Sequence, residues 1–254
     1  MKYEIDYIEF WATGHCNLNC KGCSSCSPIA EKWFLDLKSI RRDLMRLNEL
    51  NIDIHNITIL GGEPLLHPGL SKIMDAVKEV YPNARLGLIT NGLMLMQMPC
   101  EFWNTCVKYN AKLSITCFPV MSEDLRCKIE EKLQNEKLDY RLTIKKRFNK
   151  ILTQNHTGDI QKIIEACGCN HAYNLKDGKV ARCTVPMAMP ILNARFNAGM
   201  LETGTYDIYT AKSGAEIMDF FSKPNESCRN CSAKPIKVDW EKADAQPQLS
   251  DWII

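Results

Sequence analysis

The sequence predicts an α/β fold in which a parallel sheet curls into a partial barrel of five or six βα units. Short segments rich in β-branched and apolar residues alternate with longer segments whose apolar residues recur at helical spacing. The alternation continues through about the first 150 residues, and repeated βα units build parallel sheets. The chain length of 254 residues suits one barrel-sized domain with a small appendage. We therefore expect a barrel over residues 1–150 and an extension over residues 151–254.

The first βα units are the clearest. Residues 3–12 form an apolar strand, and Asp36 then caps a helix with an apolar stripe. That stripe consists of Leu37, Ile40, Leu44, Leu47 and Leu50. Residues 55–60 return to a β-branched pattern, and residues 70–81 to a helical one.

Three further units follow with the same logic. Strands are expected at 84–90, 112–117 and 139–145, and helices at 99–109 and 121–135. In such a barrel the chemistry lies at the carboxyl ends of the strands. Polar or cysteine-bearing segments directly after these strands are therefore the first candidates for a site.

The last hundred residues have a different pattern. Residues 155–158 are polar and suit a linker. Strands at 173–175 and 179–182 flank Lys176, Asp177 and Gly178, and an Asp-Gly pair readily supplies the positive φ angles of a hairpin turn. A helix is expected at 213–221, closed by Pro224.

Composition excludes several classes of protein. The net charge is only +2 with basic residues spread along the chain, which gives no electrostatic reason to expect nucleic acid or a membrane surface as partner. The chain shows neither a signal peptide nor a run of about 18 apolar residues. Without a secretory signal, the 13 cysteines favour metal binding over disulfides, and we expect a cytoplasmic protein.

The most informative motif is a cysteine triplet, Cys16, Cys20 and Cys23, just after the first strand. A 4Fe-4S cluster uses one thiolate for each iron, so three cysteines leave one iron open for a ligand. The alternative is a structural zinc site that also uses Cys26. Zinc sites usually have two cysteine pairs separated by a longer spacer, which disfavours this alternative.

The spacing Cys-x3-Cys-x2-Cys resembles that of the radical S-adenosylmethionine (radical SAM) enzymes, and Gly61-Gly-Glu-Pro64 and Thr90-Asn-Gly92 extend the resemblance. In that family the open iron binds S-adenosylmethionine, and the reduced cluster cleaves it to a 5′-deoxyadenosyl radical that takes a hydrogen atom from substrate. The resemblance implies that Gly61, Gly62 and Glu63, with Pro64 completing the motif, line the methionine amino group. It implies that Thr90 and Asn91 lie near the ribose.

One residue departs from the family pattern. An aromatic residue that packs near the adenine usually precedes the third cysteine, but this chain has Gly22 there. His15, Trp33 and Phe34 are the candidates to replace it.

A second cysteine group lies in the extension: Cys167, Cys169, Cys183, Cys228 and Cys231. The hairpin brings Cys169 and Cys183 to its open end, and the later helix returns Cys228 and Cys231 toward them. This group resembles the shortened auxiliary-cluster extension, called a twitch domain, of many radical SAM enzymes. The resemblance implies a second 4Fe-4S cluster on Cys169, Cys183, Cys228 and Cys231, with Cys167 as the alternate ligand. A zinc ribbon has the same ligand set and is the competing interpretation.

The resemblance implies a radical SAM enzyme that uses flavodoxin or ferredoxin as reductant. Its substrate class stays open between small polyols and peptides. Peptide maturases commonly carry an amino-terminal leader-binding domain, and this chain starts about fifteen residues before its first cluster cysteine. We therefore expect a small, sugar-like substrate that is oxidised or epimerised, with peptide modification as the alternative. A metal-stabilised binding module, the non-enzymatic alternative, leaves the open-iron triplet unexplained.

Cys117 ends the predicted strand 112–117. If its thiol points into the mouth of the barrel, it would donate a hydrogen atom to a substrate radical and make the enzyme an epimerase. Strand alternation equally allows the thiol to point at the helices as a buried residue with no chemical role.

Overall fold

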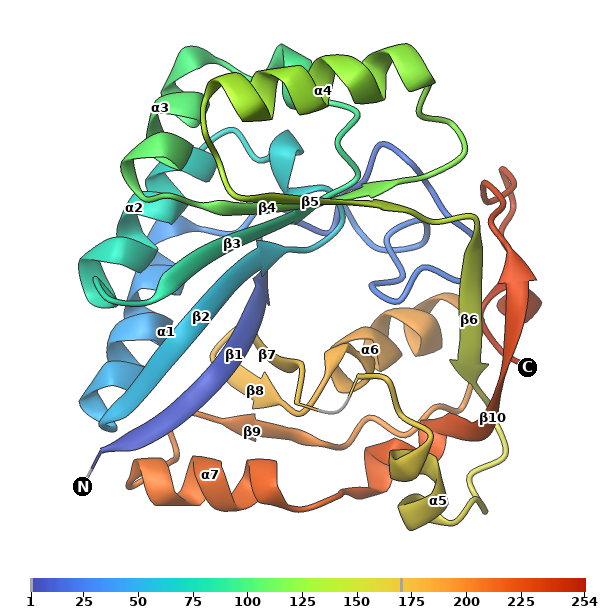
Figure 1. The fold of residues 1–254 in the computed structure, drawn as a ribbon. Helices are drawn as coiled ribbons and strands as arrows, with labels where there is room; N and C mark the ends of the chain where they lie inside the picture. The colour runs from blue at the N-terminus through green and yellow to red at the C-terminus, as the bar shows by residue number, and fades with distance from the viewer. Residues whose placement is uncertain (1, 170) are drawn as a thin grey trace. The chain divides into compact units, whose positions relative to one another are not determined.

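A computed structural model describes residues 2–169 and 171–254 of the chain (Figure 1). They form two compact units. The first unit consists of Met1–Asn17 and Lys32–Lys146, and the second of Leu18–Glu31 and Arg147–Ile254. The second unit includes residues 18–31, which the sequence did not indicate.

The first unit contains a parallel sheet in the order β5-β4-β3-β2-β1, joined at each step by a helix. Its strands are β1 (Tyr3–Trp11), β2 (Ile52–Leu60), β3 (Arg85–Thr90), β4 (Lys112–Cys117) and β5 (Tyr140–Ile144). Its helices are α1 (Leu37–Glu49), α2 (Leu70–Val80), α3 (Cys100–Lys108) and α4 (Glu123–Asn135), with short 3₁₀ turns η1 (Pro64–Leu66) and η2 (Leu95–Gln97). The partial barrel is therefore confirmed, and each predicted element occurs within a few residues of its expected place.

Local chemistry explains these elements. Asp36 accepts a hydrogen bond from the Ser39 amide at 2.9 Å and so begins α1. Ser122 caps α4 in the same way. The helices cover one face of the sheet (Figure 1), and the apolar residues of the strands, such as Ile57 and Ile115, are buried.

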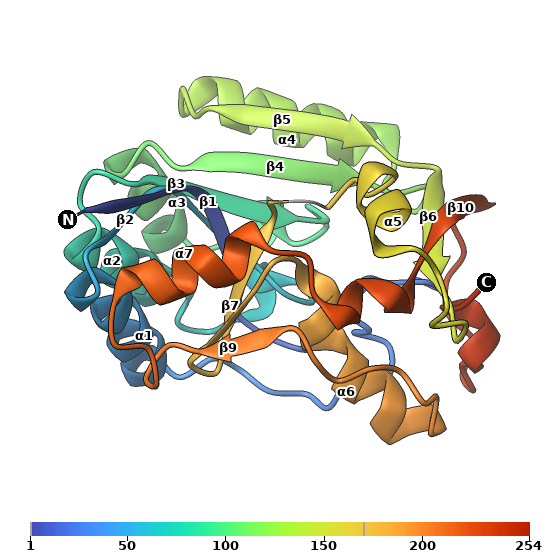
Figure 2. The ribbon, with the colours of Figure 1, turned by 90° about the horizontal axis from the view of Figure 1, so that it is seen from below.

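The second unit contains two groups of antiparallel strands. The first joins β7 (Tyr173–Lys176), β8 (Lys179–Ala181) and β9 (Thr205–Asp207). Asp177 and Gly178 have φ values of 50° and 71°, so the predicted hairpin turn is confirmed. The second pairs β6 (Arg147–Leu152) with β10 (Cys231–Asp239), which lie side by side in Figure 2.

The second unit also contains α5 (Ile160–Glu165), α6 (Thr184–Phe196), α7 (Gly214–Ser222) and the 3₁₀ turns η3 (Glu226–Asn230) and η4 (Leu249–Asp251). Only α7 was predicted. Helix α6 carries Pro190 in its interior, where proline disfavours a helix. Its buried residues are not confined to one stripe, so the sequence also lacks the apolar periodicity that predicts a helix. No helix within the described ranges is long and apolar enough to cross a bilayer.

Candidate functional site

The Gly61-Gly62 turn lies directly against the segment that leads into the cysteine triplet. Gly62 donates its amide to the Thr13 carbonyl at 2.7 Å, and Glu63 donates to the His15 carbonyl at 2.8 Å. A β-carbon on Gly62 would lie 2.2 Å from the His15 oxygen, and one on Gly61 would lie 2.5 Å from the Thr13 oxygen. Only glycine permits this approach, which places the start of the cluster loop against the end of β2.

Glu63 joins the turn after β2 to the turn after β3. Its side chain is fully buried. One carboxylate oxygen accepts hydrogen bonds from the Thr90 hydroxyl at 2.6 Å and the Leu65 amide at 3.1 Å, and the other accepts from the Asn91 amide at 2.8 Å. Burial raises the pKa of Glu63 to about 7, although these three donors oppose the shift. The carboxylate thus links the turn after β2 to the turn after β3.

Thr90 and Asn91 likewise have protein partners. The Thr90 hydroxyl accepts from the Gly92 amide at 2.9 Å while it donates to Glu63. The Asn91 side-chain amide donates to the Asn17 side-chain oxygen at 2.8 Å and lies 3.9 Å from the Cys16 sulfur. The structure therefore places Asn91 beside the first cysteine of the triplet.

Cys20 and Cys23 lie in the second unit, beside two tryptophans. The Trp240 indole donates to the Cys20 sulfur at 3.1 Å, and the Trp252 indole donates to the Cys23 carbonyl at 3.0 Å. Cys26 is fully buried. Neither tryptophan was singled out by sequence analysis, because they are more than 200 residues from the cysteines in sequence.

The residues proposed to replace the missing aromatic at Gly22 have different surroundings. The His15 amide donates to the Thr13 hydroxyl, and that hydroxyl donates to the Trp33 carbonyl. Phe34 packs edge-on against His67 with ring centroids 5.5 Å apart, yet 46% of it is exposed. Of these candidates, Phe34 has the aromatic surface available for a further contact.

The structure gathers all five cysteines of the second group within the second unit. Cys183 and Cys231 each interact electrostatically with both Cys167 and Cys228, and Cys169 interacts with Cys167, Cys183 and Cys231. The Cys169 amide donates to the Cys167 sulfur at 3.3 Å. Cys183 lies two residues after β8 and directly before α6. Cys228 lies on η3, and Cys231 is the first residue of β10. The alternate ligand Cys167 is therefore as central to the group as Cys169.

Burial makes two thiols of this group harder to ionise. Burial raises the pKa of Cys183 to about 12 and also raises the pKa of Cys231. A metal that binds here releases protons as it converts the thiols to thiolates.

The donor chemistry of both groups fits iron-sulfur clusters. Thiols make up all the expected ligands, and thiolates are the ligands that such clusters require. Among residues 2–169 and 171–254, no three His, Cys, Asp or Glu side chains are close enough to hold one metal ion together. A 4Fe-4S cluster sets a different requirement, since each thiolate binds its own iron.

Cys117 does not point where the hydrogen-donor hypothesis requires. It lines a cavity of about 200 Å³ together with Ser122, the N-cap of α4, and Arg126, a residue of α4. Burial raises its pKa, and its charged neighbours, Arg126 and Glu130, are both on α4. Alternation along β4 thus directs the thiol at the helix-covered face, and the geometry argues against the donor role.

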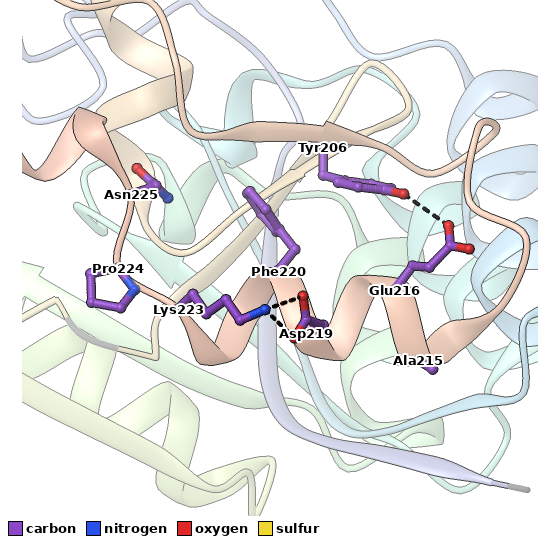
Figure 3. A pocket seen from close by; sticks show the side chains of 8 residues that line it. All are labelled: Tyr206, Ala215, Glu216, Asp219, Phe220, Lys223, Pro224 and Asn225. Atoms are coloured by element: carbon purple, nitrogen blue, oxygen red, sulfur yellow. Dashed lines mark hydrogen bonds and ion pairs between the residues drawn. The ribbon is translucent and has the colours of Figure 1, made fainter.

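A second hollow, of about 570 Å³, lies beside α7 (Figure 3). The Tyr206 hydroxyl donates to Glu216 at 3.0 Å, and Lys223 pairs with Asp219 at 2.6 Å. Phe220 supplies an apolar wall. None of the expected ligands lines this hollow, so we do not assign a function to it.

Comparison with known proteins decides the family. Residues 12–112 match the model of the radical SAM superfamily, and this range includes the cysteine triplet and both glycine turns. Residues 12–112 are a radical SAM domain. The matched range contains the cluster loop and the turns that contact it, whereas the second cysteine group lies outside that range.

Two proteins named GTP 3′,8-cyclase are similar to this chain in sequence. A GTP 3′,8-cyclase of Helicobacter pylori is 23% identical over 90% of this chain and 76% of its own length. A GTP 3′,8-cyclase of Geobacter sulfurreducens is 31% identical, but the match spans only 38% of this chain and 30% of that protein.

Solved radical SAM structures share the fold. BtrN, solved with AdoMet and 2-DOIA, matches with a TM-score of 0.57 at 17% identity, over the whole of both chains. The anSMEcpe enzyme with bound AdoMet matches with a TM-score of 0.58 at 12% identity, over 90% of this chain and 82% of that one.

Proposed function

We propose that this radical SAM enzyme binds one 4Fe-4S cluster through Cys16, Cys20 and Cys23, binds an auxiliary cluster in its second unit, and oxidises a small, sugar-like substrate. The observation that carries the proposal is the contact of the Gly61-Gly62 turn with the cluster loop. It joins the three family motifs through main-chain hydrogen bonds and the Glu63 carboxylate.

When bound, the first cluster supplies the electron that cleaves S-adenosylmethionine, and the auxiliary cluster supplies an electron acceptor. The protein's own contribution is to hold and orient. Thr13 and His15 fix the start of the loop on the turn after β2, and Asn91 lies beside the Cys16 sulfur. Four of Cys167, Cys169, Cys183, Cys228 and Cys231 would bind the auxiliary cluster, and their proximity in one unit supports this assignment.

Two comparisons support a sugar-like substrate. BtrN, which this chain matches over its full length, was solved with 2-DOIA, and the curated relatives are named for a reaction of GTP, which carries a sugar ring. Oxidation is favoured over epimerisation because Cys117 lies against α4. Peptide modification is the second candidate, because anSMEcpe, of similar fold, has been solved with a bound peptide.

Anaerobic reconstitution tests the proposal. The chain should take up about eight irons, four for each cluster, and should form 5′-deoxyadenosine from S-adenosylmethionine in the presence of dithionite. The substrate is then sought among 2-DOIA, GTP and a cysteine-containing peptide, by mass spectrometry of the products. A measured content of about four irons and one zinc would show that the second cysteine group forms a zinc ribbon and not an auxiliary cluster. A full iron load without 5′-deoxyadenosine would favour the binding module.

A further inference from the structure

The C-terminal strap, which we define as residues 240–252, is built onto the loop that carries Cys20 and Cys23. Cys20 and Lys242 form an antiparallel bridge. Lys21 donates its amide to the Glu241 carbonyl at 2.9 Å, and Ala243 donates to the Asn19 carbonyl at 2.6 Å. The strap therefore pairs with the loop through its main chain, so the two segments have a defined register.

Side chains strengthen this pairing. The Lys21 ammonium lies 3.2 Å from Glu241 and 3.1 Å from Asp244, both on the strap. Trp252 is only 2% exposed and donates to the Cys23 carbonyl. The exposed ion pairs are individually weak, but the buried tryptophan anchors the far end of the strap.

The strap also accounts for Gly22. This residue has a φ of +65°, where residues with side chains are strained. A β-carbon there would lie 3.3 Å from the Asp251 carbonyl oxygen. The strap thus lies against Gly22, the residue before the third cysteine of the triplet.

Trp240 is the strap residue whose side chain forms a hydrogen bond with a proposed cluster ligand, Cys20. An indole nitrogen can only donate a hydrogen bond, so the Cys20 sulfur is the acceptor at 3.1 Å. Cys20 is buried, at 7% exposure, which weakens competition from water. Reduction of a cluster adds negative charge that is shared with its sulfur ligands, and a donor aimed at one of them stabilises the reduced form more than the oxidised form.

We propose that Trp240 is a positioning residue that raises the reduction potential of the catalytic cluster through its hydrogen bond to Cys20. The inference rests on the proposed function, because it requires a cluster on Cys16, Cys20 and Cys23. It assigns to the C-terminal strap a role that the family motifs do not contain.

The first test is a redox titration of reconstituted Trp240→Phe, followed by electron paramagnetic resonance. The catalytic cluster is identified as the signal that changes when S-adenosylmethionine is added. We expect reduction to become about tenfold less favourable, equal to about 59 mV more negative for a one-electron step. Trp103→Phe, in α3, is the control, because the Trp103 ring packs edge-on against Phe102 within the first unit. An unchanged potential in Trp240→Phe with a full iron load would overturn the inference.

The second test needs no variant, so it holds even if Trp240→Phe loses iron. Tryptophan labelled with ¹⁵N in the indole ring is incorporated into the unaltered chain, and electron spin echo spectroscopy measures ¹⁵N coupling to the reduced catalytic cluster. We expect a resolved coupling, because the Trp240 nitrogen is hydrogen-bonded to a ligand sulfur, whereas Trp252 donates to a carbonyl. A cluster without such coupling would refute the role of Trp240. A chain that forms no catalytic cluster would instead contradict the proposed function.

Discussion

Replacing Gly62 by alanine should disrupt the cluster loop. The added β-carbon would lie 2.2 Å from the His15 oxygen and 2.5 Å from its carbonyl carbon, both in the main chain. A separation of at least 3.0 Å requires the two segments to move apart by roughly 0.8 Å. The hydrogen bonds of 2.7 Å and 2.8 Å from Gly62 and Glu63 would then be stretched beyond good geometry.

The expected loss of stability follows from these contacts. Overpacking of this kind costs about 1–3 kcal/mol. Each weakened main-chain hydrogen bond adds about 1 kcal/mol. With two such hydrogen bonds, we therefore expect Gly62→Ala to lose about 3–5 kcal/mol in urea unfolding of the reduced, metal-free chain, measured by circular dichroism. The reconstituted variant should also lose the four irons of the catalytic cluster, because Cys16 follows the displaced carbonyl directly.

Gly69→Ala is the matched control. Its added β-carbon would meet no heavy atom closer than 3.5 Å, an ordinary contact with the His67 ring. It should therefore retain its iron and lose at most about 1 kcal/mol, the scale of an altered helix cap. If Gly62→Ala unfolds at the same urea concentration as this control and binds as much iron, the close approach of the turn does not position the loop.

Four other predictions address single groups. Thr90→Val should lose about 1.5–3 kcal/mol, because it removes the hydroxyl that donates to Glu63, whereas Thr90→Ser should retain most of that stability; equal losses in urea unfolding would contradict this. Because the folded-state pKa of Glu63 is raised from 4.5 to about 7, stability of the metal-free chain should fall by up to about 3 kcal/mol as pH rises from about 4.5 through 7. Glu63→Gln should flatten that slope, and a slope that persists in the variant would assign it to another group. Cys26→Ala should retain 5′-deoxyadenosine formation while Cys16→Ala, Cys20→Ala and Cys23→Ala lose it; normal formation in any of these three would refute the ligand assignment. Cys117→Ala should leave the product unchanged once a substrate is found, and loss of an inverted product would restore the hydrogen-donor hypothesis.

The sequence by itself determined the barrel and predicted the cysteine ligands. Helix α1 begins at Asp36 and strand β4 spans Lys112–Cys117 as the local patterns predicted, because capping and periodicity act over a few residues. The cysteine triplet could likewise be recognised from the sequence, because the spacing of the cysteines is a local property. The hairpin turn at Asp177 and Gly178 belongs to the same class.

Only the tertiary structure decided what the polar residues of those motifs contact. The Glu63 carboxylate accepts hydrogen bonds from Thr90 and Asn91, at the end of the next strand. Cys117 faces α4, and the sequence could not predict this because strand alternation allows either face. The pairing of β6 with β10 and the contact of Trp240 with Cys20 join segments far apart in the chain. Such contacts leave no periodic signal, because they depend on how the intervening chain returns and not on the residues next to them in sequence.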